Sequence, residues 1–303
     1  MSTSHSPSLP LLPAILLTAG LAAAAALYAQ PLAPVQVFDA VCALSTPDLA
    51  DWRISGGLAR EAWVSRIACP RAGDAPQALR IEVRPGDAYD SSPGDLPNER
   101  VEIQARRELV RFDQPAWYRF RFRLAAPWHA QTNRTVIHQV KQNIESKLEI
   151  ANGGHCPSAN PFFKIEAGWR DEVAAPAFVV KTRGTDNCRD GLSGIAVCGP
   201  WALRTGQWHQ VHVRIRPSLR EGDSDLQVWL DGRACPRMNG RLGYADAGRR
   251  DKEGRPFIDA QPRFGIYRDA LPNTVQAIEF ADLVFWHADP SSQLAWALLA
   301  QTD

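Results

Sequence analysis

The sequence lacks an excess of charge of either sign. Its 303 residues include 34 Lys and Arg against 33 Asp and Glu, so the formal net charge is only +1. A chain without a global basic field does not carry the electrostatic footprint that usually attracts nucleic acids. We therefore expect no nucleic-acid partner, and any recognition of a charged molecule must rest on a local cluster of side chains.

Stretches that favour a helix are also scarce. The chain contains 23 prolines and 21 glycines, which helix interiors tolerate poorly. Only Ser291 to Leu299 has a helical pattern. A composition with 45% hydrophobic and 22% charged residues is ordinary for a globular protein. These features favour an all-β domain of many short strands.

The N-terminal region has almost no charge. No charged side chain occurs from Leu9 to Ala29, and the run from Ile15 to Leu27 is mostly Leu and Ala. This pattern predicts a signal peptide over residues 1–29, followed by one domain over 30–303 in a secreted or periplasmic protein. The residues before Leu9 include no Lys or Arg, so an uncleaved N-terminal membrane anchor is the alternative.

The six cysteines include no close Cys-x-x-Cys pair, so a zinc site is not indicated and disulfides are expected outside the cytosol. Short enclosed segments favour at least two disulfides, with Cys42 bonded to Cys69 and Cys188 to Cys198, which leaves Cys156 for Cys235. The alternative is that some of these residues are free, buried thiols.

The sequence gives little support to metal chemistry. Five of the histidines are scattered without the spacing of metal ligands: His129, His155, His209, His212 and His287. We expect no cofactor. A structural calcium ion would be compatible with such a domain, but no motif indicates one.

Segments with alternating apolar and polar residues recur along the chain, as strands with one buried face require. They are Leu79 to Val83, Trp117 to Leu124, Thr135 to Asn143, Trp208 to Arg216, Leu226 to Leu230 and Ala277 to Trp286. Asp231-Gly232 is a tight-turn signal, and the Pro/Gly/Asp-rich segment over 84–98 predicts a functional loop. The absence of strand–helix alternation favours a two-sheet antiparallel sandwich or jelly roll.

Three further strand segments carry polar side chains at positions that a sandwich tolerates only on a surface or in a binding groove. In the first, Arg100, Glu102 and Gln104 share one face, opposite Val101 and Ile103. In the second segment, Gln139 and Lys141 share one face, opposite His138 and Val140. In the third, Arg263, Gly265 and Tyr267 share one face, opposite Phe264 and Ile266.

These segments resemble motifs of a known enzyme family. The sequences NERVEI (98–103), IHQVK (137–141), GQWHQVHVRIRPS and LQVWLDG (206–232), and RFGIYRD (263–269) are similar to those of polysaccharide lyases of the heparin lyase I type. Their order and spacing also resemble the related alginate and glucuronan lyases. The resemblance implies a concanavalin-like β-jelly-roll sandwich of two antiparallel sheets, in which Arg-x-Glu, Gln-x-His and Lys-x-Gly-x-Tyr strands lie side by side.

The resemblance implies a carbon–oxygen lyase that cleaves a uronic-acid-containing polysaccharide by β-elimination. It assigns Tyr267, Lys141 and His138 as catalytic candidates, and it assigns substrate binding to Arg100, Glu102, Gln139, Arg263 and Arg268. Two positions depart from the family pattern, since Lys141 stands at the position of the family His and Arg263 at that of the family Lys. His138 precedes Gln139 instead of following it.

Such an enzyme must neutralise the uronate carboxylate before the C5 proton can leave, and Arg100 and Gln139 are suitable hydrogen-bond donors. We expect Arg100, Gln139 and Arg263 to converge, with Glu102 orienting a neighbouring cation. Tyr267 then exchanges the proton with the sugar, because nearby cations favour a phenolate.

Two other classes of function compete with this interpretation. A non-catalytic carbohydrate-binding jelly roll would keep the basic residues without needing Tyr267. A glycoside hydrolase would need two suitably spaced carboxylates, and the nearest match, Glu221-Gly222-Asp223, has Leu226 in place of the second Glu. Trp128 and Trp169 are candidates for sugar stacking. We expect a monomer whose partner is an acidic polysaccharide, with a membrane involved only if the leader is uncleaved.

Overall fold

The computed structural model describes Cys42 and Trp296 together with the ranges 51–55, 65–70, 78–89, 98–106, 108–128, 134–142, 149–150, 154–155, 161–185, 194–244, 249–250, 256–257, 259–271 and 273–290. Within these residues every regular element is a β-strand. The helix expected from Ser291 to Leu299 lies outside the described residues except for Trp296. The leader expected over 1–29 also lies outside them. No helix in the described part of the chain is long and apolar enough to cross a membrane.

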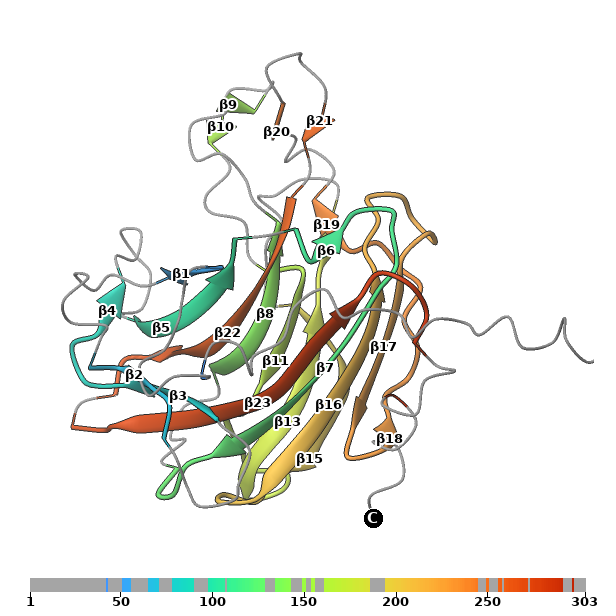
Figure 1. Cartoon of the computed structure of the whole chain (residues 1–303). Coiled ribbons are helices and arrows are strands. Elements are labelled where there is room, and N and C mark those ends of the chain that lie inside the picture. The colour runs from blue at the N-terminus through green and yellow to red at the C-terminus, as the bar shows by residue number, and fades with distance from the viewer. Residues whose placement is uncertain are drawn as a thin grey trace, which may run out of the picture. The chain divides into compact units, whose positions relative to one another are not determined.

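Two large sheets form the fold (Figure 1). The ten-stranded sheet runs in the order β1-β5-β22-β8-β11-β13-β12, with β15 paired to β13, β4 to β5 and β6 to β22. Its strands are β1 (Trp52–Ser55), β4 (Ala88–Tyr89), β5 (Asn98–Ala105), β6 (Val110–Arg111), β8 (Thr135–Gln142), β11 (Phe163–Glu166), β12 (Trp169–Arg170), β13 (Ala175–Thr182), β15 (Ile195–Ala202) and β22 (Asp259–Asp269).

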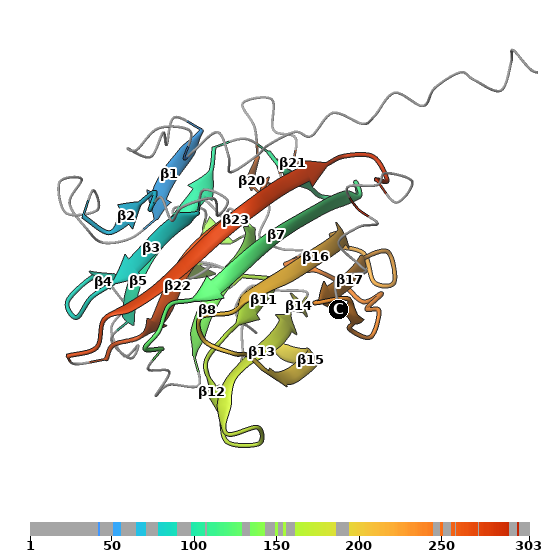
Figure 2. The same cartoon turned by 60° about the horizontal axis from the view of Figure 1, so that its bottom comes forward.

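The seven-stranded sheet has the order β18-β17-β16-β7-β23-β3-β2, and its central strands β16, β7, β23 and β3 lie side by side in Figure 2. They are β2 (Ile67–Ala68), β3 (Leu79–Val83), β7 (Ala116–Leu124), β16 (Trp208–Arg216), β17 (Asp225–Leu230), β18 (Arg233–Ala234) and β23 (Gln276–Trp286). The remaining described strands form three two-stranded sheets: β9 (Glu149–Ile150) with β10 (Gly154–His155), β14 (Gly184–Thr185) with β19 (Gly243–Tyr244), and β20 (Arg249–Arg250) with β21 (Pro256–Phe257).

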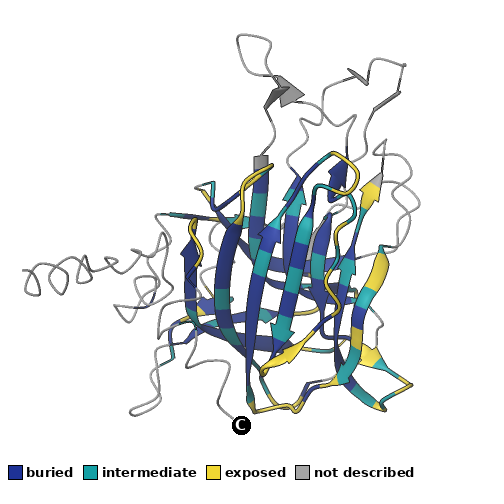
Figure 3. Cartoon of the chain, turned by 90° about the vertical axis from the view of Figure 1, so that its right-hand side faces the viewer, coloured by how far each residue is buried: buried dark blue, intermediate teal, exposed yellow. Residues whose placement is uncertain are grey.

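All pairings within the two large sheets are antiparallel, which confirms the expected sandwich. The core lies between the sheets, where Phe120 of β7 and Phe280 of β23 make edge contacts with Phe264 of β22. Buried positions follow the central strands in Figure 3. On β7 the apolar residues are buried while Arg119, Arg121 and Arg123 are half-buried on the other face, as the alternation predicts.

The turn expected at Asp231-Gly232 joins β17 to β18. Both residues have positive φ, 49° and 79°, and Leu230 pairs directly with Arg233. This backbone is typical of the two-residue hairpin turn that matches strand twist. The sequence signal therefore identified the hairpin correctly.

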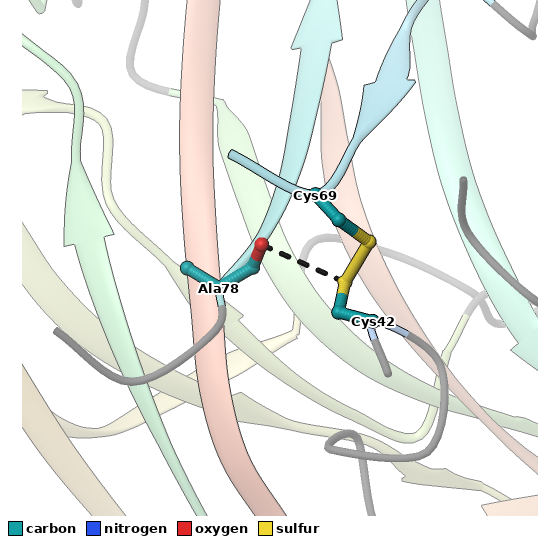
Figure 4. Close-up of a disulfide and its surroundings, with 3 residues drawn as sticks. All are labelled: Cys42, Cys69 and Ala78. Atoms are coloured by element: carbon teal, nitrogen blue, oxygen red, sulfur yellow. Dashed lines mark hydrogen bonds between the residues drawn. A yellow bond between two sulfur atoms is a disulfide. The ribbon is translucent and has the colours of Figure 1, made fainter. Parts of the chain in front are cut away.

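One expected disulfide is confirmed and the other expected pairings are wrong. Cys42 is bonded to Cys69 (Figure 4). Cys198, however, is bonded to Cys235 and not to Cys188, so Cys235 is not the partner of Cys156 either. Cys188 and Cys156 lie outside the described residues. The short-loop argument failed here because Cys198 lies on β15 and Cys235 follows β18, strands of different sheets that the fold brings together.

At the edge of the ten-stranded sheet, β15 pairs with β13 in an interrupted register. The register shifts between Phe178 and Val180, opposite Gly199, which has a φ of 89°. A Cβ atom at Gly199 would stand 2.2 Å from the carbonyl oxygen of Phe178. The break in the ladder therefore requires glycine at this position.

Arg268 lies on the core face of β22, where it joins the two sheets. Its side chain is fully buried, and Nε donates to Glu99 Oε2 at 2.8 Å. Nη1 donates to Gln276 Oε1 on β23 at 2.8 Å, and Nη2 donates to the carbonyl oxygen of Thr274 at 2.6 Å. The structure thus places Arg268 away from the other predicted substrate-binding residues and gives it an anchoring contact between the sheets.

Replacing Arg268 by Met would leave the Glu99 carboxylate buried without its cation. We expect the free energy of unfolding to fall by about 3–5 kcal/mol, the scale for removing one partner of a buried ion pair. Urea denaturation followed by tryptophan fluorescence measures this loss. Arg220→Met is the matched control, because Arg220 is 71% exposed beside Asp223. If both variants unfold at the same urea concentration, Arg268 does not anchor the sheets.

Candidate active site

A continuous row of polar side chains crosses the ten-stranded sheet on the face opposite the core, here called the polar face. Arg263 of β22 is paired with Gln104 of β5 on one side and with Gln139 of β8 on the other. Directly paired residues of an antiparallel sheet point to the same face. The structure therefore brings together residues from three motifs that are far apart in the sequence.

Gly265 separates Arg263 from Tyr267 on the polar face of β22. It has a φ of 147°, and a Cβ atom there would stand 2.2 Å from the carbonyl oxygen of Val101. Any other residue would be strained and would clash with β5. Because Gly265 has no side chain, the polar face at this position is formed by side chains of the neighbouring strands.

Glu102 of β5 reaches across β22 at this point. It is paired with Gly265, and its Oε1 accepts a hydrogen bond of 2.5 Å from Gln139 Nε2 on β8. Its Oε2 lies 3.4 Å from Nε of Arg100. Glu102 is fully buried and Gln139 nearly so. The carboxylate therefore contacts one guanidinium and one amide, and no part of it is exposed to solvent.

Tyr267 lies between two guanidinium groups. The Arg100 carbon Cζ is 4.3 Å from the ring centroid, and the Arg134 Cζ is 5.1 Å from it. Arg100 is also the cross-strand partner of Tyr267. Both guanidinium groups therefore make cation–π contacts with the ring, which hold the phenol in place beside two cations. Arg134 was missed in the sequence because it precedes its strand and belongs to none of the quoted motifs.

Lys141 lies at the other end of the same face, paired with Gln261 of β22. Its pKa is lowered to about 7, mainly by burial and in addition by the charges of Arg263 and Arg100, while the charge of Glu102 opposes them. A lysine with this pKa is partly neutral at physiological pH and can accept a proton. Beside it, Gln104 Nε2 donates to Gln261 Oε1, so amide groups line this end.

His138 does not share the polar face. It is fully buried in the core, stacked on Phe264 with ring centroids 4.4 Å apart. Its Nδ1 donates to the carbonyl oxygen of Arg263 at 2.8 Å, and its Nε2 accepts from the Tyr118 hydroxyl at 2.7 Å. Burial lowers the pKa of His138 to about 3. The imidazole is thus neutral, has both nitrogens engaged, and supports the backbone of Arg263 from below.

The two candidate stacking tryptophans differ in exposure. Trp128 is buried, and its indole Nε1 donates to the carbonyl oxygen of Ala167 at 3.2 Å. Trp169 is 37% exposed on β12, with Nε1 donating to Asp171 Oδ1 at 2.9 Å. Only Trp169 therefore presents a ring to solvent. Within the described ranges, no cluster of three metal-ligating side chains occurs.

The neutral, buried state of His138 generates a prediction about acid stability. An unfolded histidine takes up a proton below about pH 6.5, whereas folded His138 does so only near 3, so the wild type loses stability as the pH falls between these values. His138→Leu should remove part of this slope. At pH 7.5 it should also cost about 1–3 kcal/mol, because it leaves the Tyr118 hydroxyl buried without its acceptor.

Urea unfolding at a series of pH values measures both effects. The double variant His138→Leu/Tyr118→Phe is the control, since it removes the orphaned hydroxyl and should recover part of the stability at pH 7.5. Equal pH slopes in the wild type and in His138→Leu would show that the imidazole is not neutral in the folded protein.

The chain is similar to known proteins both in its sequence pattern and in its fold. A family model described as "Polysaccharide lyase" matches residues 48–285. The endo-β-1,4-glucuronan lyase from the fungus Trichoderma reesei superposes with a TM-score of 0.50 at 16% identity, covering 78% of this chain and 87% of that one. A variant of alginate lyase Aly36B in complex with an alginate trisaccharide also gives 0.50, at 12% identity, with 78% and 88% covered. No curated protein sequence matches the chain. At these identities the two structures establish the jelly-roll fold.

Proposed function

The chain belongs to the polysaccharide lyase family, and on this premise we propose that its polar face binds a uronic-acid-containing polysaccharide and cleaves it by β-elimination. The observation that carries the proposal is the convergence of Arg263, Tyr267 and the Glu102–Gln139 pair on the polar face around Gly265. This arrangement places cations, an amide and a phenol side by side, the groups that binding a carboxylate and transferring a proton require.

Binding starts with the carboxylate of the sugar. Arg263 and Arg100 offer planar forks of donors that suit a carboxylate, and Gln139 has a second amide hydrogen besides the one given to Glu102. Neutralising the carboxylate lowers the energy of the carbanion that forms when the C5 proton leaves. Because Glu102 holds Arg100 and Gln139 before substrate arrives, these donors need little reorganisation during the reaction.

The proton transfers are assigned to Lys141 and Tyr267. The neutral amine of Lys141 takes the C5 proton, and the electron pair of that C–H bond forms the double bond between C4 and C5. The C4–O bond breaks, and the leaving oxygen receives a proton from the Tyr267 hydroxyl. Both groups lie on the polar face, on opposite sides of Gly265 along β22. His138 takes no part in proton transfer, because it lies in the core.

The finer identity of the substrate is also a proposal. The two superposed structures are a glucuronan lyase and an alginate lyase. The motifs resemble the heparin lyase I type, and the planar guanidinium of Arg263 suits a sulfate as well as a carboxylate. We propose an unsulfated polyuronate, since the groups around Gly265 supply carboxylate-binding donors from three strands without a separate sulfate site.

The disulfides support a location of the protein outside the cytosol. Disulfides such as Cys42–Cys69 and Cys198–Cys235 are typical of compartments outside the cytosol. We propose that residues 1–29 are removed as a signal peptide and that residues 30–303 act outside the cytosol as a monomer. This location is where an acidic polysaccharide would be met.

Tyr267→Phe tests the acid. It removes only the hydroxyl, so unfolding and polysaccharide affinity should stay close to those of the wild type while turnover falls by about a hundredfold or more. Absorbance of the unsaturated product on a panel of polyuronates measures turnover. Near-normal turnover in this variant would remove Tyr267 from the mechanism. A wild type that binds polyuronates without ever giving an unsaturated end would be a carbohydrate-binding module.

Lys141→Gln tests the base through the pH profile. If the neutral amine accepts the proton, kcat/KM of the wild type should rise with pH through about 7, the pKa to which burial lowers Lys141. The variant should lose this rise and fall by about a hundredfold at pH 8. Arg214→Gln, which removes a charge from the other sheet, is the control and should leave the pH profile unchanged. A variant with the same rising limb would exclude Lys141 as the base.

A further inference from the structure

A second cluster of cations lies on the polar face beyond Gln139. The row of paired residues continues from Gln139 to Lys164 of β11, and from Lys164 to Lys181 of β13. All three side chains therefore point to the same face as Arg263. Strands lie about 4.8 Å apart, so Lys181 is roughly 14 Å from β22. The mechanism proposed above uses none of these cations.

Glu166 holds this cluster together. It is almost fully buried, and Lys164 Nζ lies 2.7 Å from its Oε1. Its Oε2 receives Arg170 Nη2 at 2.7 Å and Lys181 Nζ at 3.0 Å. Burial opposes the ionisation of Glu166, but the charges of Lys164 and Lys181 outweigh it and lower the pKa. One carboxylate thus faces three cations, which leaves an excess of positive charge.

Arg183 adds a fourth cation. It directly follows β13, continues the alternation of Lys181, and its backbone N–H donates to the carbonyl oxygen of Phe162. The side chain contacts the Tyr244 hydroxyl, and its charge helps to lower the pKa of Lys164, after burial as the main cause. Its Nε and Nη1 atoms are buried yet have no hydrogen-bond partner among the described residues. Buried donors of this kind call for an acceptor.

A pocket adjoins the cluster at the edge of the sheet. Lys181 and Arg170 line it together with Val179, Ala196 and Pro200, which offer an apolar surface. Asp171 and Glu172 also line it. These two carboxylates repel an anion. The side of the cluster formed by Lys164 and Arg183 is therefore the more favourable place for an anion to bind.

From this geometry we infer a second carboxylate-binding subsite, formed by Lys164, Lys181 and Arg183 around Glu166. It takes the carboxylate of another uronate in the same chain, whose cleaved bond lies over Gly265. The inference rests on the proposed function and deepens it. The polysaccharide would cross the strands from β22 toward β13, and an acidic chain several sugars long would bind more tightly than a short one.

Arg183→Gln tests the subsite, because Arg183 is not part of the Glu166 ion pairs. With uronate oligosaccharides of the type that the wild type cleaves, KM for an octasaccharide should rise about tenfold, the scale of one charge-assisted hydrogen bond. Both kcat and the KM for a trisaccharide should stay unchanged. Arg183→Lys should keep most of the octasaccharide affinity. Arg214→Gln makes the same change of charge on the other sheet, beside Asp225, and should alter neither KM.

Each result has a distinct meaning. An unchanged octasaccharide KM in Arg183→Gln, or an equal rise for both lengths, overturns the subsite while the lyase activity stands. If the wild type releases no unsaturated product from any polyuronate, the proposed function fails, and calorimetry of octasaccharide binding to the same variants tests the subsite alone. Should Arg183→Gln unfold at a lower temperature than the wild type, Lys181→Gln is measured in its place with the same two oligosaccharides.

Discussion

The candidate site depends on one contact, the hydrogen bond that Gln139 of β8 donates to Glu102 of β5 across the intervening strand β22. On the strand between them, Gly265 is the direct partner of Glu102, and a Cβ atom at this glycine would clash with the backbone of β5. The same carboxylate contacts Arg100, whose guanidinium lies over the ring of Tyr267. Residues from three strands therefore form one polar unit, centred on the Glu102 carboxylate.

Much of this arrangement could be predicted from side-chain alternation. The alternation separated Arg100, Glu102 and Gln104 from Val101 and Ile103, and the structure places Val101 and Ile103 in the core. The same rule already placed His138 with Val140 on the opposite face, and applied to β22 it would have placed Arg268 with Phe264 and Ile266 on the core face. The motif resemblance led us to count both as site residues, although the period of two already indicated otherwise.

Other features could not be reached from the sequence. Lys164 and Glu166 lie in the short segment FKIE, which gives no sign that three cations converge on one carboxylate. The pairing of Cys198 with Cys235 depends on which strand edges the fold brings together, and sequence separation does not record that. The lowered pKa of Lys141 depends first on its burial in the folded protein and then on the charges of Arg263 and Arg100, which come from other strands. In each case the deciding interaction is long-range.

The interrupted edge at β15 has a consequence for association between molecules. A long regular edge strand exposes unpaired backbone groups and invites another chain to extend the sheet. Here Gly199 breaks the ladder in the middle of the strand, and the Cys198–Cys235 bond fixes the neighbouring residue to the segment after β18. A second copy approaching this edge would find no continuous run of hydrogen-bonding groups. The bulge that looks like a local irregularity thus protects the sheet from growing into an aggregate when the protein is concentrated.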